Sequence, residues 1–263
     1  MSKSKICHLP TFGRLIAFCF MLAILFSLIG CANPTLVSEV GRGDLAMIKT
    51  FVEGGEDINQ RDAHSGYTPL MNAAYYNQYP IAQYLLEKGA DVNLRGSDGR
   101  TALMVAAYYN HLPIAQILLK SSADIDIQDN IGSTALMLAA ENNHLPMAEL
   151  LLKSEANIDI QDTNGRTALM LAAENNHVPM AEVLLKSKAN VNIQDKQGAS
   201  ALIIAVLNKY VRMVKLLLEH EADENLADQT GHTARTYAID FYYAEYPRTA
   251  VKDIGNLFGI VKE

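Results

Sequence analysis

A threonine or serine returns every 33 residues along this chain of 263 residues. A glycine two residues before it and an alanine five residues after it keep the same register. The hydroxyl-bearing positions are Thr68, Thr101, Thr134, Thr167, Ser200 and Thr233. A fixed short period is typical of stacked structural units, each of which buries its apolar face only against its neighbours. The register therefore predicts one elongated array that needs no single large core.

Local chemistry predicts where the helices of one unit, residues 132–164, begin and end. Thr134 is a suitable N-cap for a first helix, because its hydroxyl can accept a free backbone N–H. Asn143 tolerates the left-handed conformation that ends a helix. Pro146 fits the first turn of a second helix, where a missing N–H is harmless, and this helix is expected to run from about Pro146 to Lys153. Each unit is therefore predicted to be a helix-turn-helix-loop module.

Packing between units is predicted from leucines and alanines at fixed positions. The second helix of each unit carries a leucine pair, which we expect to be buried against both neighbours. These pairs are Leu85-Leu86, Leu118-Leu119, Leu151-Leu152, Leu184-Leu185 and Leu217-Leu218. Paired alanines in the first helix, such as Ala73-Ala74, allow neighbouring helices to approach closely.

Two segments, residues 66–70 (Gly-Tyr-Thr-Pro-Leu) and 88–93 (Lys-Gly-Ala-Asp-Val-Asn), resemble the ankyrin-repeat family, and six copies keep one register. The resemblance covers about residues 36–263. It implies an all-α fold, a solenoid of about six to seven 33-residue units. The implied units are an N-terminal cap repeat 36–65, repeats 66–98, 99–131, 132–164, 165–197 and 198–230, and a C-terminal cap 231–263.

The chain departs from the family pattern where the first helix begins. Ankyrin repeats carry histidine in Thr-Pro-Leu-His, where it ties the turn to the helix. The corresponding residues of this chain are Met71, Met104, Met137, Met170 and Ile203. A flexible apolar ladder then replaces a hydrogen-bonded one, and we expect looser turns.

Residues 1–30 differ in kind from the rest of the chain. Three basic residues precede an apolar run of fifteen residues from Leu15 to Ile29, a pattern typical of a secretory signal peptide. The run ends in Leu28-Ile29-Gly30-Cys31, which resembles the lipobox of bacterial lipoproteins, in which the cysteine is lipidated after cleavage. An uncleaved membrane anchor is the alternative, but fifteen apolar residues fall short of the ~20 needed to span a bilayer.

The resemblance to lipoproteins implies a lipid anchor at Cys31, with residues 31–35 as a short lipidated linker. Ala32 after the cysteine, in place of aspartate, resembles the pattern that sends lipoproteins to the outer membrane. We therefore expect the protein in the bacterial cell envelope, with secretion as the alternative location.

The charge and the cysteine content of the chain exclude some classes of partner and of binding site. Removal of residues 1–30 leaves 19 basic and 29 acidic residues, which changes the formal charge from −7 to −10. Such a chain is a poor match for a phosphate backbone, so nucleic acid is not an expected partner. The three cysteines are Cys7, Cys19 and Cys31, so the mature chain can form neither a disulfide framework nor a thiol metal site.

A search for catalytic or metal-binding groups finds only residues at repeat spacing. His111, His144 and His177 belong to units stacked ~10 Å apart, whereas ligands of one zinc ion lie ~2 Å from it, so we expect a structural role for them. Glu141 and Glu174 are also one repeat apart on an open face, and an enzymatic alternative would rest on them. The sequence contains no nucleophile elbow, phosphate-binding loop or HExxH motif. We therefore expect that the protein is not an enzyme and has no cofactor, metal or small-molecule substrate.

The resemblance also implies a binding surface. In ankyrin proteins, hairpin tips and the ends of the first helices line a concave groove that binds partners. The matching residues are Tyr67, Tyr75, Tyr76, Arg100, Tyr108, Tyr109, Ser133, Glu141, Asn142, Arg166, Glu174 and Asn175. We expect Tyr75, Tyr76, Tyr108 and Tyr109 to align into one patch, and contiguous apolar patches tend to be binding sites. The alternative is that these tyrosines only cover hydrophobic surface while the acidic residues solubilise the array.

A second aromatic group is assigned to the core of the C-terminal cap. It consists of Tyr237, Phe241, Tyr242, Tyr243 and Tyr246.

The predicted function is a non-catalytic protein–protein interaction module, tethered to the bacterial envelope, that holds an unknown protein partner in its groove. The alternative function is that of a secreted ankyrin effector of a host-associated bacterium, acting on host proteins.

Overall fold

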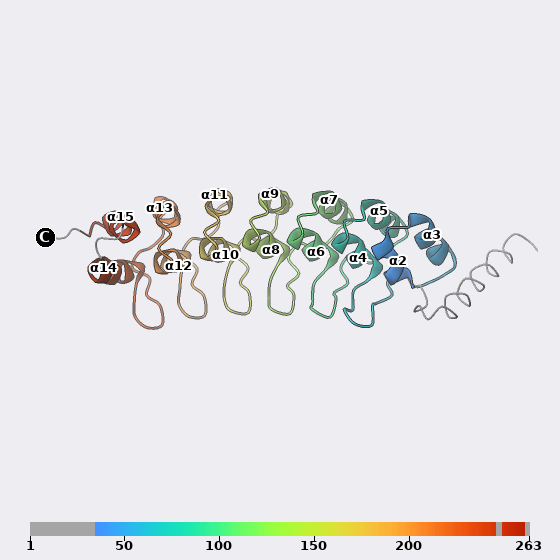
Figure 1. Ribbon diagram of the computed structural model, residues 1–263, viewed down its shortest axis with the longest axis horizontal. Coiled ribbons are helices and arrows are strands. Elements are labelled where there is room, and N and C mark those ends of the chain that lie inside the picture. Colours follow the sequence, from blue (N-terminus) through green and yellow to red (C-terminus); the bar gives the residue numbers. More distant parts are fainter. Residues whose placement is uncertain (1–34, 246–248, 261–263) are drawn as a thin grey trace, which may run out of the picture.

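The computed structural model describes residues 35–245 and 249–260, which form a row of helix pairs (Figure 1). The pairs are α2 (Leu36–Arg42) and α3 (Leu45–Glu53), α4 (Pro69–Tyr75) and α5 (Tyr79–Glu87), α6 (Ala102–Tyr108) and α7 (Leu112–Lys120), α8 (Ala135–Glu141) and α9 (Leu145–Lys153), α10 (Ala168–Glu174) and α11 (Val178–Lys186), α12 (Ala201–Leu207) and α13 (Val211–Glu219), and α14 (Ala234–Glu245) and α15 (Thr249–Leu257). The all-α solenoid is confirmed. The predicted signal segment 1–30 and Cys31 lie outside the described residues.

The first helices begin and end at the predicted residues. In α8, the side-chain oxygen of the N-cap Thr134 accepts the Met137 N–H at 3.3 Å. Asn143, two residues beyond the helix, has a φ of 56°, the left-handed conformation expected of it. The second helix, α9, begins at Leu145, one residue earlier than predicted, and Pro146 is its second residue. A proline there still lies within the first turn, so no helical hydrogen bond is lost.

Alanines set the spacing of the first helices. Ala139 and Ala140 of α8 are fully buried, as are the paired alanines of α4, α6 and α10. Because these side chains end at Cβ, neighbouring first helices pack more closely than neighbouring second helices do. The result is two parallel rows of helices, with the first helices in the tighter row (Figure 1).

The prediction that both leucines of each second-helix pair are buried is wrong for four of the five pairs. Leu151 is fully buried, but its neighbour Leu152 is only half-buried. Both residues are buried only in the pair Leu184-Leu185. The reason is geometric: consecutive helical residues point about 100° apart, so one leucine enters the core while the other lies at its edge.

The hairpins between repeats are hydrogen-bonded to their neighbours. Nε2 of Gln128 donates to the carbonyl of Gly132 in its own hairpin at 2.7 Å and to that of Gln161 in the next hairpin at 2.9 Å. The turn aspartate Asp129 accepts the N–H groups of Ile131 and Ser133 in its own turn. Gly132 has a φ of 81°, and a Cβ there would lie 2.6 Å from the backbone nitrogen of Thr163, which explains a glycine at this place in the repeat.

The recurring histidines tie each repeat to the one before it. Nδ1 of His111 lies 2.7 Å from the carbonyl oxygen of Ala74, and Nδ1 of His144 lies 3.1 Å from that of Ala107. His177 makes the corresponding contact. These bonds span 37 residues of sequence, so the histidines have the structural role that was expected. Within residues 35–245 and 249–260, no cluster of three or more His, Cys, Asp or Glu side chains could hold a metal ion.

The methionine ladder is fully buried but not purely apolar. Met71 and Met104 are 1% exposed, and their sulfur atoms accept the N–H groups of Thr68 and Thr101 at 3.5 and 3.4 Å. Thioether sulfur is a weak acceptor. In these two repeats, a weak hydrogen bond therefore links turn to helix where the sequence led us to expect none.

The C-terminal pair closes the array with aromatic residues. Tyr242 is buried, and the Tyr237 hydroxyl donates to Oδ2 of Asp228 at 2.6 Å. The assignment of Tyr243 to the core of this cap is wrong, because its side chain is 64% exposed. Tyr246 lies outside the described residues.

No helix in the part of the chain that the structure describes is both long and apolar enough to cross a membrane.

Candidate protein-binding groove

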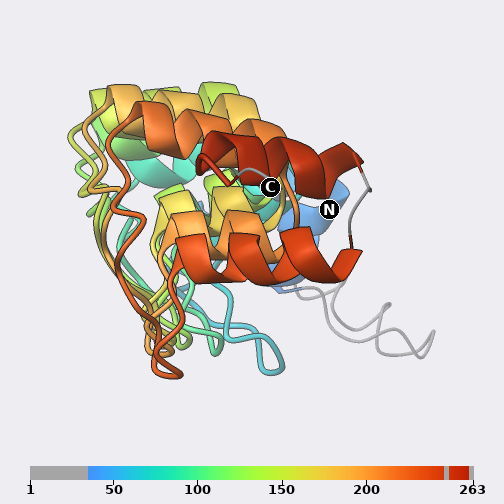
Figure 2. The same ribbon diagram turned by 90° about the vertical axis from the view of Figure 1, so that its left-hand side faces the viewer.

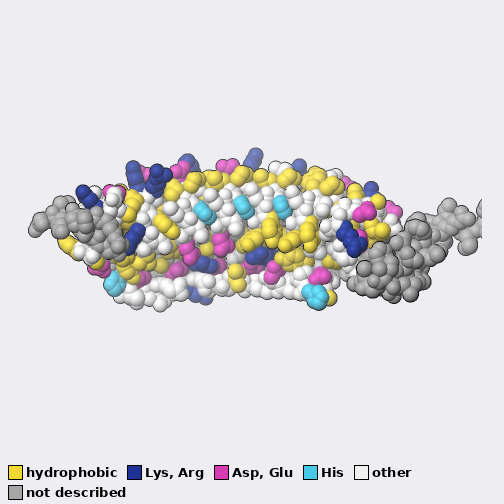
Figure 3. Space-filling model, in the orientation of Figure 1, with side chains coloured by type: hydrophobic (Ala, Val, Ile, Leu, Met, Phe, Trp, Pro, Cys, Tyr) yellow, Lys and Arg dark blue, Asp and Glu magenta, His cyan; other side chains and the backbone are white. Residues whose placement is uncertain are grey.

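The hairpins extend from one side of the helix rows, which gives the array an L-shaped cross-section (Figure 2). The first helices face the inner angle of this L, beside the hairpins. Hydrophobic side chains gather there over α4 and α6, and acidic side chains lie nearer α8 and α10 (Figure 3). The candidate residues lie in the hairpins and at the ends of the first helices, which border this inner angle, and we call this face the groove.

Four of the candidate tyrosines form a continuous row of rings. In the order Tyr76, Tyr75, Tyr109 and Tyr108, each ring meets the next edge to face, with centroids 4.8, 4.9 and 4.9 Å apart. Tyr75, Tyr76 and Tyr109 expose 41, 50 and 41% of their surface, while Tyr108 is half-buried. We call these four side chains the tyrosine row. Its geometry is the favourable one for aromatic pairs, so the rings support one another while they face solvent.

The residues beneath the row hold the rings in place. A Cβ on Gly41 of α2 would lie 3.1 Å from the ring of Tyr76, so the bare glycine lets this ring lie close to the helix. At the other end, Tyr109 stacks on His111, with centroids 5.8 Å apart and ring planes 18° from parallel. Burial and a hydrogen bond with Tyr75 raise the pKa of Tyr109. The Tyr109 hydroxyl therefore keeps its proton at neutral pH and remains a hydrogen-bond donor.

Tyr67 lies beside the row and lines a cleft at its N-terminal end. The cleft has a volume of about 340 Å³ and is lined by α2, the first hairpin, Tyr75 and Tyr76. The Tyr67 hydroxyl donates to Oδ2 of Asp98 at 2.8 Å. Burial and this bond to a carboxylate raise the pKa of Tyr67 well above its ordinary value. The Tyr67 hydroxyl therefore donates its proton to Asp98 and not to a partner, and only part of its ring faces the cleft.

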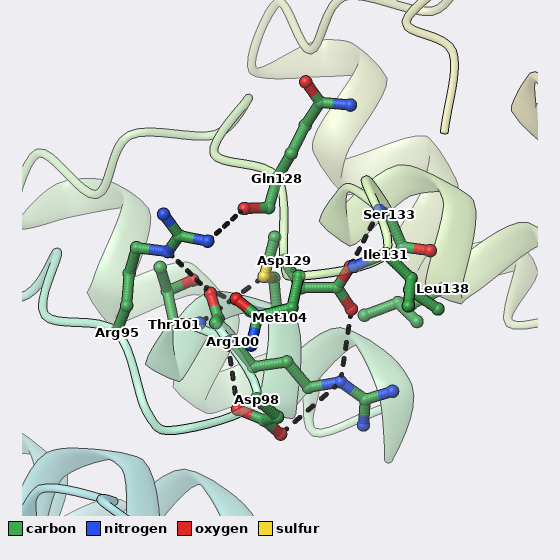
Figure 4. Close-up of polar contacts among 12 residues, drawn as sticks. Arg95, Asp98, Arg100, Thr101, Met104, Gln128, Asp129, Ile131, Ser133 and Leu138 are labelled. Atoms are coloured by element: carbon green, nitrogen blue, oxygen red, sulfur yellow. Dashed lines mark hydrogen bonds and ion pairs between the residues drawn. The ribbon is translucent and has the colours of Figure 1, made fainter. Parts of the chain in front are cut away.

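Arg100 turns toward the hairpin carboxylates (Figure 4). Its Nε lies 3.8 Å from Oδ2 of Asp98 and 3.6 Å from Oδ2 of Asp129. Its guanidinium carbon also lies 5.0 Å from the centre of the Tyr108 ring, a cation–π distance. The charge of Arg100 is thus largely satisfied by carboxylates of its own hairpin and the next.

The acidic part of the groove contains one paired and one unpaired glutamate. Arg166 bridges Asp162 and Glu174, with nitrogen–oxygen distances of 2.9 and 3.2 Å. Glu141, the corresponding residue one repeat earlier, is exposed and makes no ion pair with any described residue. The two glutamates are therefore not equivalent, although the sequence repeat suggests that they are.

The two candidate asparagines point their amides back at their own helices. Nδ2 of Asn142 donates to the carbonyl of Leu138 at 2.8 Å, and Nδ2 of Asn175 donates to that of Leu171 at 2.9 Å. Both side chains thus satisfy helix-end carbonyls. Their amide N–H groups are less available to a partner than expected, although both residues lie at the edge of the groove.

Two exposed apolar residues in the described hairpins and first helices were missed in the sequence. Leu207 is 42% exposed and occupies, seven residues after Ser200, the place held by Tyr75 and Tyr108 in their repeats. Ile131 is 55% exposed in the hairpin before α8. The repeat register alone could have found Leu207, because the residue at that place also ends the first helices α4, α6, α8 and α10.

The chain matches models of the ankyrin-repeat family along most of its length. A family model of ankyrin repeats in three copies matches residues 36–129 and 123–195, and a model of ankyrin repeats in many copies matches residues 186–238. Among curated relatives, the chain is 40% identical over 68 residues to ankyrin repeat and SAM domain-containing protein 6 of Rattus norvegicus, covering 26% of this chain and 8% of the relative.

Two further relatives match over similarly short stretches. Protein phosphatase 1 regulatory subunit 27 of Homo sapiens is 45% identical over 58 residues, covering 22% of this chain and 36% of the relative. A putative ankyrin repeat-containing protein of Treponema pallidum is 34% identical over 68 residues, covering 26% of this chain and 23% of the relative. The chain thus spans well under half the length of these three relatives.

Proposed function

Because the chain belongs to the ankyrin-repeat family, whose fold is generally a non-catalytic scaffold for protein–protein interaction, we propose that it binds a partner protein along the inner groove. The observation that carries this proposal is the tyrosine row. Three of its four rings are more than one third exposed, yet each is fixed by an edge-to-face neighbour. Rigid, exposed tyrosines offer large contact area at low entropic cost, which is what binding surfaces use.

Capture from an envelope extract tests the proposal. The full chain in detergent is compared with a variant in which Tyr75, Tyr76, Tyr108 and Tyr109 are all changed to alanine. We expect a partner that the wild-type chain retains and that the variant loses, while urea unfolding shows that the variant is folded. Equal retention by both chains would place the binding site elsewhere, and retention by neither would count against a binding function.

We further propose that the protein is a lipoprotein of the outer membrane, anchored through Cys31. The support is the signal-like segment with its lipobox and the Ala32 that follows the cysteine. The first described residue, Thr35, follows the cysteine by four residues, so an anchored array would begin within ~20 Å of the bilayer at ~3.3 Å per extended residue. A groove held there would meet partners of the envelope.

Metabolic labelling with a fatty acid tests the anchor. We expect label in the wild-type chain, which has a cysteine at the lipobox position, and none in a Cys31→Ser variant, which has no thiol there to acylate. Gel fluorescence of the immunoprecipitated chain is the measurement. An unlabelled wild-type chain recovered from the medium would overturn the anchor and favour the alternative of a secreted effector.

A further inference from the structure

Two neighbouring repeats of this chain are near-copies, and one of their differences alters the charge of the groove. Residues 132–162 and 165–195 differ at six of 31 positions. One of the six places Ser133 where the later copy has Arg166. Arg166 lies 3.2 Å from Glu174 and 2.9 Å from Asp162, so both of these carboxylates have a cation.

The corresponding positions 33 residues earlier hold the same two carboxylates, Asp129 and Glu141, but a serine in place of the arginine. Asp129, which corresponds to Asp162, obtains a cation from the preceding hairpin, because Nε of Arg100 lies 3.6 Å from its Oδ2. Arg100 cannot also serve Glu141, since it lies against Asp98 and over the ring of Tyr108. Ser133 is buried and carries no charge. Glu141 therefore remains exposed without a cation among the described residues.

Glu141 also lies next to the tyrosine row. It occupies in α8 the place that Tyr108 occupies in α6 and Tyr75 in α4, and these helices pack side by side. Acidic side chains border the hydrophobic patch on the side of α8 and α10 (Figure 3). Helices in contact lie ~8–10 Å apart, so the row and Glu141 together span three repeats, or ~20 Å. An extended segment of about six residues has that length.

We propose that the partner enters the groove as an extended, basic segment, with an apolar side chain on the tyrosine row and a lysine or arginine on Glu141. This inference rests on the proposed groove function and gives the chemistry of the partner. A cation from the partner does for Glu141 what Arg166 does for Glu174. Charge pairs of this kind set specificity and register, while the aromatic contacts provide most of the affinity. The net charge of −10 for the chain without residues 1–30 also favours a basic partner.

A selection from a phage library of random 12-residue peptides on the full chain provides the probe. We expect enriched peptides to carry a lysine or arginine a few residues from an aromatic or aliphatic residue. The peptide that binds most tightly is then synthesised in two forms: the basic peptide, as selected, and the glutamine peptide, in which glutamine replaces the basic residue. The Kd of each peptide is measured by fluorescence anisotropy.

Three variants locate the charge contact. Ser133→Arg supplies an internal cation to Glu141 by copying Arg166, and Glu141→Gln removes the carboxylate. Both are expected to weaken the basic peptide about tenfold and to leave the glutamine peptide unchanged. Glu149→Gln is the matched control: because Glu149 is an exposed carboxylate of the same repeat but lies on α9, outside the groove, this variant should bind both peptides as the wild-type chain does. Urea unfolding of each variant shows that it is folded.

The possible outcomes separate the two proposals. Enriched peptides that depend on the tyrosine row but lack basic residues, or that bind the Ser133→Arg variant unchanged, would overturn the basic partner and leave the groove function standing. Peptides that bind the tyrosine variant as well as the wild-type chain, or no enrichment at all, would overturn both. Weakening by Ser133→Arg and Glu141→Gln that is confined to the basic peptide supports the inference.

Discussion

Replacement of Leu151 by alanine will lower the free energy of unfolding by about 3 kcal/mol. The side chain of Leu151 is fully buried in α9, which packs against α8 and lies between α7 and α11. Truncation removes apolar surface from the core and leaves a cavity whose walls belong to several helices. Those helices are fixed by their own contacts along the array, so the cavity cannot collapse fully. Equilibrium unfolding in urea, followed by circular dichroism, measures the loss.

Leu152→Ala is the matched control for this prediction. Leu152 is the adjacent residue, has the same chemistry and the same helix, but is only half-buried, so we expect a loss of about 1 kcal/mol. Equal losses for the two variants would mean that both leucines of the pair are buried against neighbouring repeats. A second unfolding transition in Leu151→Ala would show that the array separates into two parts at the weakened repeat.

Local rules predicted the helices because the relevant interactions lie within a few residues. The hydroxyl of Thr134 needs only the N–H of Met137, and the left-handed backbone of Asn143 follows from its own side chain. The repeat period then sets the stacking order. The predicted burial was wrong where it depends on which side of a helix faces its neighbour, as for Leu152. It was also wrong at Tyr243, a residue of the last helix pair that no further repeat covers.

The groove was predictable in outline but not in its contacts. The period places Tyr75 and Tyr109 in adjacent repeats, and the structure shows their rings in edge-to-face contact. The partner of Arg100 could not be read from the period, because the arginine turns to Asp129 of the next hairpin. Whether a groove residue is free or already satisfied depends on side chains one repeat away. Sequence periodicity aligns those side chains but does not give their directions.

Tyr109→Ala will weaken binding of the captured partner by about thirtyfold, the loss typical of a hot-spot residue. Tyr109 is one of the two inner rings of the row: it contacts both Tyr75 and Tyr108, and it also stacks on His111. Its loss removes exposed contact area, leaves Tyr108 without an edge-to-face partner in the row and leaves Tyr75 with Tyr76 alone. The Kd is measured by isothermal titration calorimetry with the purified partner.

The size of this effect depends on the ring, not the hydroxyl, and two variants separate these contributions. Tyr109→Phe keeps the edge-to-face contacts and should weaken binding by less than about fivefold, the value of one hydrogen bond. Tyr243→Ala removes an even more exposed tyrosine, at the C-terminal end and outside the row, and should leave the Kd unchanged. A comparable loss from Tyr243→Ala would mean that exposed tyrosines anywhere on the array bind the partner. The ordered row would then have no special part in recognition, and its edge-to-face geometry would serve only to cover the α4 and α6 surface.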